Sequence, residues 1–293
     1  MTRLLASVVD VVDGFDVAVL DQFGVLLSGA GAYPGAAAAI AALADRGKAI
    51  VVLSNSGKRA AANRERLAGF GLPTEQIGHV VTSGEALWED LASGRLSLSD
   101  TGVARLHPIC ASPDDATAWA AGNPRVEIVF GEPTDADAVL AMGVPDDIAI
   151  DAFDSTLRTA LAADLTLICS NPDRRAPRGD RMVLSPGALA ERYQEMDGRV
   201  VWYGKPHAPS FAAVRRLHPE VPAKRFLMIG DSLEHDIAGG AAAGFSTLLV
   251  RGGVHEAAFG SADDAATIGA AIDALAHGAG GDAVPTYSLA VFA

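Results

Sequence analysis

The sequence is poor in cysteine and has no long hydrophobic run, and each of these features excludes a class of protein. Only two of the 293 residues are cysteines, Cys110 and Cys169, so we expect buried thiols rather than a disulfide framework or a cysteine metal site. No charge-free apolar stretch of about eighteen residues occurs, although the mean hydropathy is +0.23, so no membrane-spanning helix is predicted. Asp10 and Asp13 interrupt the apolar N-terminus, which argues against a signal peptide and predicts a cytoplasmic protein.

Basic residues are also scarce. The chain has 23 Lys and Arg against 36 Asp and Glu, which gives a net charge of −13. This composition predicts no basic face for a nucleic-acid backbone or an anionic membrane, so neither is an expected partner. An acidic surface also repels anions at long range. Any phosphate-binding site in this protein would therefore need its own local positive charge or a metal ion.

The chain has an enzyme-like composition, with 49% hydrophobic and 20% charged residues, and its length favours two folded units. Apolar runs that resemble buried parallel strands alternate with alanine-rich segments that resemble helices. Two stretches lack this pattern: a loop rich in Arg, Pro and Gly at 171–181, and the segment 278–293, which we expect to be a loosely attached tail.

Polar residues follow four of the predicted strands. Asp21 ends the apolar run 15–21, and the pair Ser54 and Asn55 follows the run 48–53. Lys205 follows a strand predicted at 200–203, and Asp231 follows one at 225–229. Because parallel strands joined by right-handed crossovers end at the same edge of a sheet, these residues are expected to meet where open α/β sheets bind ligands.

The residue types at these strand ends suit one kind of chemistry. They comprise a potential carboxylate nucleophile, a hydroxyl and an amide donor, a fixed cation, and the acidic pair Asp231 and Asp236, which suits Mg²⁺. Several of them have an ordinary structural explanation. Asp21 could be a solvated loop residue or a helix N-cap, Ser54 and Asp236 could be helix N-caps, with Asp236 opening a helix, and Lys205 could be a solvated surface lysine.

The ordered set resembles the haloacid dehalogenase (HAD) superfamily. Its four motifs correspond to Asp21-x-x-Gly24-Val25, Leu53-Ser54-Asn55, Lys205, and Gly230-Asp231-Ser232-x-x-x-Asp236. Further segments resemble class IIA, the branch that includes nitrophenyl-phosphate and pyridoxal-phosphate phosphatases; they are Tyr33-Pro-Gly35, Thr82-Ser-Gly84, Ser170-Asn-Pro-Asp173, Ser185-Pro-Gly187, Gly204-Lys-Pro206 and Ala243-Gly244.

This resemblance implies an α/β fold with a Rossmann-like parallel-sheet core and an inserted α/β cap. The core would comprise residues 1–82 and 199–293, and the cap residues 83–198. The expected activity is that of a Mg²⁺-dependent phosphatase acting on a small phosphorylated metabolite. Class IIA caps often form dimers, so a homodimer through the cap is one arrangement that the resemblance allows.

The resemblance also implies a role for each strand-end residue. Asp21 would attack phosphorus to form an aspartyl-phosphate, and Lys205 would neutralise charge on the nucleophile and the phosphoryl group. Ser54 and the backbone N–H of Asn55 would bind the phosphoryl oxygens. Mg²⁺ would bind Asp21, Asp231 and the backbone carbonyl of Phe23. Its outer shell would be ordered by Asp236 and Ser232.

Phe23 departs from the family pattern. HAD phosphatases have a second aspartate two residues after the nucleophile, where it serves as the general acid and base. Three hypotheses follow: a phosphatase that is slow or confined to good leaving groups, a non-catalytic protein that binds phosphate and Mg²⁺, and a C–halogen hydrolase. Haloacid dehalogenases also have an aromatic residue at this position, but they need no metal and have a different cap.

Overall fold

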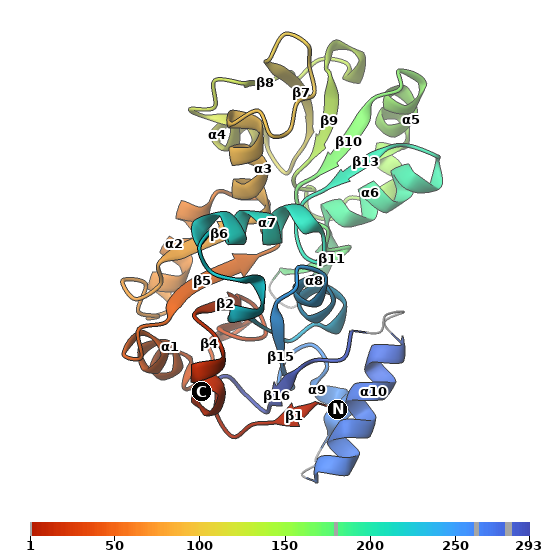
Figure 1. Ribbon diagram of the computed structural model, residues 1–293. Coiled ribbons are helices and arrows are strands. Elements are labelled where there is room, and N and C mark those ends of the chain that lie inside the picture. Colours follow the sequence, from red (N-terminus) through yellow and green to blue (C-terminus); the bar gives the residue numbers. More distant parts are fainter. Residues whose placement is uncertain (1, 179–180, 261–263, 279–282) are drawn as a thin grey trace. The chain divides into compact units, whose positions relative to one another are not determined.

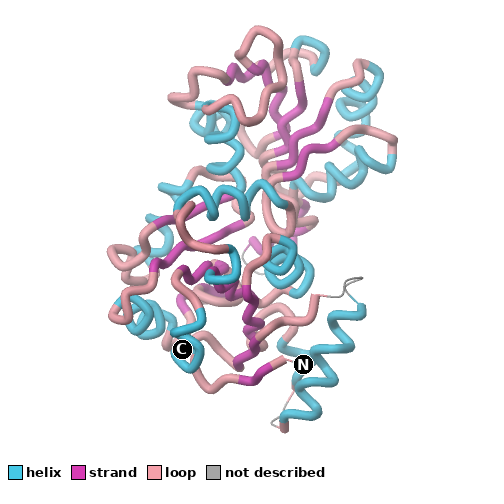
Figure 2. The backbone as a smooth tube through the Cα atoms, in the orientation of Figure 1, coloured by secondary structure: helices cyan, strands magenta, loops and turns pink. Residues whose placement is uncertain are grey.

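The computed structural model describes residues 2–178, 181–260, 264–278 and 283–293. The chain forms two compact units. The first comprises residues 1–54, 61–81 and 205–293, and the second comprises residues 55–60 and 82–204. Each unit contains its own sheet with helices around it, so the predicted α/β class is confirmed (Figures 1 and 2).

The first unit is built on a seven-stranded sheet, and its pairs from β1 through to β5 are parallel. In sheet order its strands are β1 (Arg3–Leu4), β16 (Tyr287–Leu289), β15 (Ser246–Val250), β14 (Phe226–Gly230), β2 (Val17–Asp21), β5 (Ala49–Ser54) and β6 (His79–Thr82). The short antiparallel hairpin of β3 (Leu27–Ser28) and β4 (Gly31–Ala32) follows β2.

Helices of the first unit pack against this sheet. They are α1 (Ala36–Ala44), α2 (Ala60–Gly69), α7 (Ala208–Leu217), α8 (Ala238–Ala242), α9 (Glu256–Phe259) and α10 (Ala265–Gly278), with short turns η1 (Val8–Gly14), η4 (Ala223–Arg225) and η5 (Leu233–Ile237). Both α1 and α7 pack on β5. The four apolar residues of β2 are each at most 1% exposed, as expected for a central strand covered on both faces.

The second unit contains a five-stranded parallel sheet. Its order is β13 (Val200–Trp202), β10 (Thr166–Cys169), β9 (Ala138–Ala141), β7 (Ala104–Ile109) and β8 (Val126–Ile128). The helices of this unit are α3 (Ser83–Ala92), α4 (Pro113–Ala120), α5 (Asp154–Ala162) and α6 (Pro186–Glu195), with short turns η2 (Pro133–Asp135) and η3 (Ile150–Phe153). Tyr193 of α6 is fully buried in the core.

Strand β13 lies in a different unit from the one predicted. The family resemblance places residues 199–204 in the core, but Val200, Val201 and Trp202 pair with Leu167, Ile168 and Cys169 of β10. The second unit therefore continues to residue 204, and the first resumes at Lys205. Local pattern could not reveal this, because an apolar run of three residues fits the edge of either sheet.

Two stretches predicted to lack structure contain strands. The loop 171–181 includes β11 (Arg175–Arg178), which pairs with β12 (Arg181–Leu184) in an antiparallel hairpin. The segment 278–293, whose residues 279–282 lie outside the description, contains β16, which is inserted between β1 and β15. The expectation of a loosely attached tail is therefore wrong. Ser288 is fully buried and its Oγ donates to the Leu249 carbonyl at 3.0 Å.

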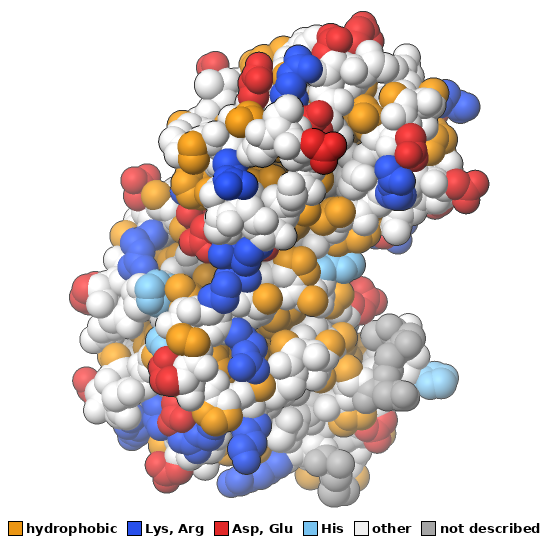
Figure 3. All heavy atoms as spheres, turned by 45° about the horizontal axis from the view of Figure 1, so that its top comes forward, with side chains coloured by type: hydrophobic (Ala, Val, Ile, Leu, Met, Phe, Trp, Pro, Cys, Tyr) orange, Lys and Arg blue, Asp and Glu red, His pale blue; other side chains and the backbone are white. Residues whose placement is uncertain are grey.

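On the face drawn in Figure 3, acidic and basic side chains are interspersed among uncharged ones. The net charge of −13 is therefore not gathered into a single area of that face. Among the helices in the described ranges, none is long and apolar enough to cross a membrane.

The buried C-terminal segment leads to a stability prediction. Phe292 is 2% exposed, whereas the preceding Val291 is 50% exposed. Phe292→Ala should lower the free energy of unfolding by about 3–5 kcal/mol, because it removes a buried aromatic ring and leaves a cavity. The matched control, Val291→Ala, should change it by about 0.5 kcal/mol or less. Urea unfolding measures both, and equal small effects would show that the segment contributes little to the core.

Candidate functional site

Asp21 lies at the carboxyl end of β2, in the middle of the seven-stranded sheet. In the ladder, Leu20 pairs with Ile229 of β14, and Asp21 pairs with Leu53 of β5. Asp231 follows β14 directly, and Ser54 is the last residue of β5. The parallel register thus brings the ends of three strands together, as predicted from the alternation of strands and helices.

A buried lysine holds the Asp21 carboxylate. Lys205 Nζ donates to Asp21 Oδ1 at 2.5 Å and to Asp236 Oδ1 at 2.7 Å. The Lys205 side chain is only 3% exposed, and those of Asp21 and Asp236 are 13% and 0% exposed. A lysine buried to this degree needs charged partners, so the alternative of a solvated surface lysine is excluded.

Asp231 is enclosed by backbone. A Cβ added to Gly24 would lie 1.8 Å from Asp231 Oδ2, and one added to Gly253 would lie 2.1 Å from the same oxygen. Gly24 also has a φ of +86°, a conformation that side chains rarely tolerate. The backbone N–H of Val254 donates to Asp231 Oδ2 at 2.7 Å. Only glycine at both positions leaves room for the carboxylate.

Asp236 belongs to the π-helical turn η5 rather than opening a helix, so the predicted helix start at this residue is wrong. Ser232 caps the turn instead, since its side chain accepts from the His235 backbone N–H at 3.2 Å. The backbone N–H of Ser232 donates to Asp236 Oδ2 at 3.1 Å. One carboxylate oxygen of Asp236 therefore binds the turn and the other binds Lys205.

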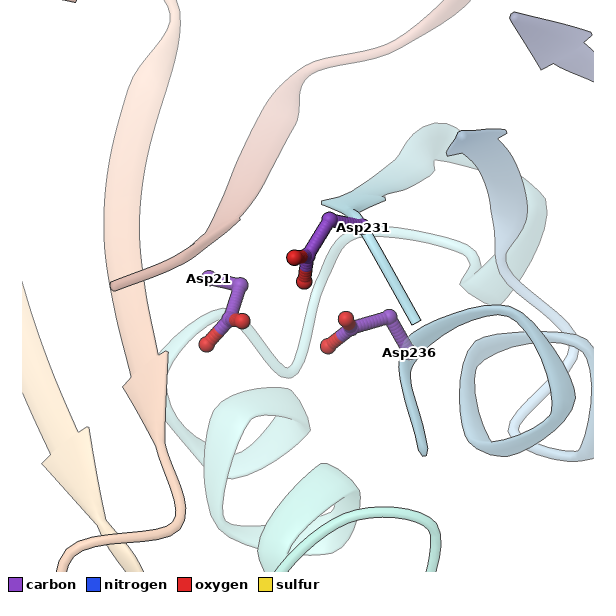
Figure 4. A group of neighbouring side chains, drawn as sticks. All are labelled: Asp21, Asp231 and Asp236. Carbon is purple, nitrogen blue, oxygen red and sulfur yellow. The ribbon is translucent and has the colours of Figure 1, made fainter. Parts of the chain in front are cut away.

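The three carboxylates form one acidic cluster, with one ligand oxygen from each lying within 4.8 Å of the others. Figure 4 shows the carboxyl groups of Asp231 and Asp236 directed toward that of Asp21. Three buried carboxylates share a single ammonium group, so the cluster has excess negative charge. Its hard oxygen donors and this charge suit a divalent cation such as Mg²⁺ or Ca²⁺.

This arrangement changes the acid–base properties of its members. Burial raises the pKa of Asp21 well above its ordinary value; the Lys205 ammonium opposes the shift, and Asp236 and Asp231 add to it. Burial raises the pKa of Asp231 to about 6, and repulsion from Asp236 acts in the same direction. Burial alone would lower the pKa of Lys205, but Asp21 and Asp236 raise it, so the ammonium stays charged. Bringing a cation close would favour the ionised carboxylates.

Ser54, Asn55 and Phe23 differ in burial and do not all belong to the same unit. Ser54 is 5% exposed at the end of β5 in the first unit, whereas Asn55 is 9% exposed and belongs to the second. Phe23 follows Asp21 by two residues and is 41% exposed, although the neighbouring carboxylates are buried. An exposed aromatic ring therefore stands at the position where the family pattern has its acid.

Sequence reasoning gave no role to two groups beside the cluster. One is the Val254 N–H, which the pair Gly252-Gly253 could have suggested, because adjacent glycines permit close backbone approach. The other is Gln22, which is fully buried and whose side-chain amide has no hydrogen-bond partner among the described residues. The backbone N–H of Gln22 donates to Asp21 Oδ1 at 2.7 Å. Nothing in the sequence marks Gln22 as buried.

Comparisons with known proteins agree with these observations. Residues 18–106 match the family described as haloacid dehalogenase-like hydrolase, and residues 202–276 match the related HAD-hydrolase-like family. Glycerol-3-phosphate phosphatase of Gallus gallus is 30% identical over 264 residues, which cover 82% of this chain and 80% of that protein.

Solved structures show the same fold. A haloacid dehalogenase-like hydrolase from Brucella suis 1330 is 26% identical, with a TM-score of 0.77 over 99% of this chain and all of the other. A p-nitrophenyl phosphatase from Archaeoglobus fulgidus is 22% identical, with a TM-score of 0.71 over 94% of this chain and 95% of the other.

The packing around Asp231 leads to a second prediction. Gly24→Ala should lower the free energy of unfolding by about 1–3 kcal/mol, since the methyl group overlaps the carboxylate and the backbone is strained. Gly29→Ala is the matched control, because a Cβ at Gly29 meets nothing within 4 Å. That variant should stay within about 0.5 kcal/mol of the wild type. If chemical denaturation gave the two variants equal stability, the enclosure of Asp231 would be looser than described.

Proposed function

Since this chain belongs to the haloacid dehalogenase-like hydrolases, we propose that it is a phosphatase acting on a small phosphorylated metabolite through an aspartyl-phosphate. The observation behind the proposal is the carboxylate of Asp21, which Lys205 holds at the end of a central strand beside Asp231. Relatives named glycerol-3-phosphate phosphatase and dihydroxyacetone phosphatase support the substrate class.

In this proposal an Asp21 oxygen attacks the phosphorus as the bond to the leaving oxygen breaks, and the leaving group departs as its anion. Water then attacks the phosphorus and the bond to Asp21 breaks, which releases phosphate and restores the carboxylate. Lys205 lies within hydrogen-bond distance of Asp21 Oδ1, so its charge is close to the attacking carboxylate throughout. The Ser54 hydroxyl and the Asn55 backbone N–H bind oxygens of the transferring group. Such fixed charges and donors are the main contribution to phosphoryl-transfer catalysis.

Mg²⁺ is the proposed cofactor. Asp21 and Asp231 would hold it together with the backbone carbonyl of Phe23, and Asp236 and Ser232 would order its surroundings. When bound, the ion would offset the negative charge of the cluster and of the phosphoryl group. The chain's own part is to keep the two carboxylates in place, through Lys205 for Asp21 and the Val254 N–H for Asp231.

Phe23 sets the expected limit on this activity. A phenyl ring cannot protonate a leaving oxygen, and general acid catalysis is worth about 10²–10⁴-fold. Esters with good leaving groups need no such proton, so they should be the best substrates. If the protein hydrolyses no phosphate ester, the same residues would instead form a non-catalytic site for phosphate and Mg²⁺. Metal-independent cleavage of a haloacid would instead favour the C–halogen hydrolase.

The first test is hydrolysis of para-nitrophenyl phosphate with and without Mg²⁺, because this ester has a good leaving group. We expect metal-dependent turnover by the wild type and a loss of at least about 10³-fold in Asp21→Asn, which removes the nucleophile. Wild-type turnover equal to that of Asp21→Asn would refute the phosphatase. Binding of phosphate without turnover would then support the non-catalytic alternative.

Restoring the missing acid is a further test of the same site. Phe23→Asp should raise the turnover of an alkyl ester such as glycerol phosphate by about 10-fold or more, because alkoxide leaving groups depend most on a proton. Phe70→Asp is the matched control, since Phe70 is an exposed phenylalanine of the same unit, at 45% against 41% for Phe23. A folded Phe23→Asp variant without any gain would show that position 23 is not what limits alkyl esters.

A further inference from the structure

The segment 55–60 follows β5 along the chain, but it belongs to the second unit and forms several hydrogen bonds with residues of that unit. The Gly84 backbone N–H donates to the Ser56 carbonyl at 3.1 Å, and the Thr82 hydroxyl donates to the Lys58 carbonyl at 2.5 Å. A Cβ on Gly84 would lie 2.0 Å from the Gly57 carbonyl oxygen. The start of α3 therefore packs directly against this segment.

The end of the segment is held by charge. Arg59 donates from Nε and Nη2 to the two carboxylate oxygens of Glu85, at 2.7 and 2.8 Å. The Arg59 guanidinium also lies 3.9 Å from the ring centre of Trp88. The Ala60 backbone N–H donates to Glu85 at 2.8 Å. A bidentate pair of this kind fixes geometry more firmly than a single contact.

The beginning of the segment is held by Asp173, whose Oδ1 accepts from Asn55 Nδ2 at 2.8 Å. Asp173 is itself fixed. Its backbone N–H donates to Asn171 Oδ1 at 3.0 Å, and its carbonyl accepts from the Gly187 N–H of α6 at 3.1 Å. Asn171 in turn donates to Ser185 Oγ at 3.3 Å. The carboxylate that holds Asn55 is thus anchored to the start of a helix.

We propose that Asp173 is a positioning residue for phosphate binding, acting through Asn55; this rests on the proposed function. The Asn55 side chain binds Asp173 within the second unit, and the backbone N–H of Asn55 is the group proposed to bind a phosphoryl oxygen. Ser54 is fixed by β5, one residue beyond the partner of Asp21. Asn55 is fixed by a residue 118 positions away in the sequence.

Losing Asp173 should affect phosphate binding through Asn55. The Asn55 side chain would lose a charged acceptor, and the direction of its backbone N–H would be less restricted. Asp21 and Lys205 would keep their geometry, because Lys205 donates to Asp21 and Asp236. Binding of phosphate should therefore weaken while the chemical step changes little, so KM rises more than kcat falls.

The experiment measures binding of inorganic phosphate in the presence of Mg²⁺ by calorimetry, and kcat and KM with para-nitrophenyl phosphate. Asp173→Ala should weaken phosphate binding and raise KM by about 10- to 100-fold, the usual range for a hydrogen bond to a charged group. Asp173→Asn keeps an acceptor oxygen and should restore both values to within about 3-fold of the wild type.

Two further variants separate positioning from a general structural effect. Asn55→Ala keeps the backbone N–H but loses the contact with Asp173, so it should match Asp173→Ala, and the double variant should show no additional loss. Asp90→Ala is the control, because it removes another polar pair of the second unit, in which Asp90 accepts from Tyr203 and Arg95. It should leave phosphate affinity unchanged.

The proposal is overturned if folded Asp173→Ala binds phosphate as the wild type does, if losses in the double variant add, or if Asp90→Ala weakens binding equally. Should Asp173→Ala not fold, the comparison of Asn55→Ala with Asp90→Ala decides the question. A wild type that binds phosphate but lacks turnover refutes the phosphatase and leaves this test intact. A wild type that binds no phosphate overturns both proposals.

Discussion

The first unit depends on how it accommodates three buried carboxylates around one ammonium group. Lys205 bridges Asp21 and Asp236, while backbone N–H groups from Gln22, Ser232 and Val254 donate to the three acids. Without these donors, burying the carboxylates would cost several kcal/mol each. One ammonium group and neutral N–H donors do not balance three carboxylates, so the cluster keeps excess negative charge. A divalent cation would complement this charge.

Glycine makes this concentration of charge sterically possible. The carboxylate of Asp231 lies where side chains at positions 24 and 253 would otherwise be, and Asp236 lies against Gly230 in the same way. These glycines occur at strand ends, so they interrupt no helix or strand interior, where glycine is costly. The tight backbone around the acids also limits their movement. The chain itself therefore holds these carboxylates in place, which is what catalysis by fixed charges requires.

This chain keeps the charged residues of the family pattern but not its second aspartate. The charged cluster is complete, yet position 23 holds an exposed phenylalanine. Removing the acid leaves the cluster intact, because residue 23 does not contribute a side chain to it. Ser54 ends β5 in the first unit, whereas the Asn55 side chain donates to Asp173 within the second. Neighbouring residues in the sequence are thus positioned by distant parts of the chain.

The sequence alone determined the α/β class and the four polar strand ends, because apolar runs and their terminal residues are local features. It indicated that Asp21 and Asp231 could meet, since parallel strands end at one edge. Lys205 follows a strand of the second sheet, so its contacts with Asp21 and Asp236 were decided by the tertiary structure. Only the tertiary structure decided that β13 joins the second sheet and that β16 enters the first. A strand of three residues fits either sheet, and its place depends on the distant strands with which it pairs. The Val254 N–H at Asp231 and the bond from Asn55 to Asp173 were likewise invisible in the sequence, since a contact between remote residues depends on how the chain packs rather than on any local pattern.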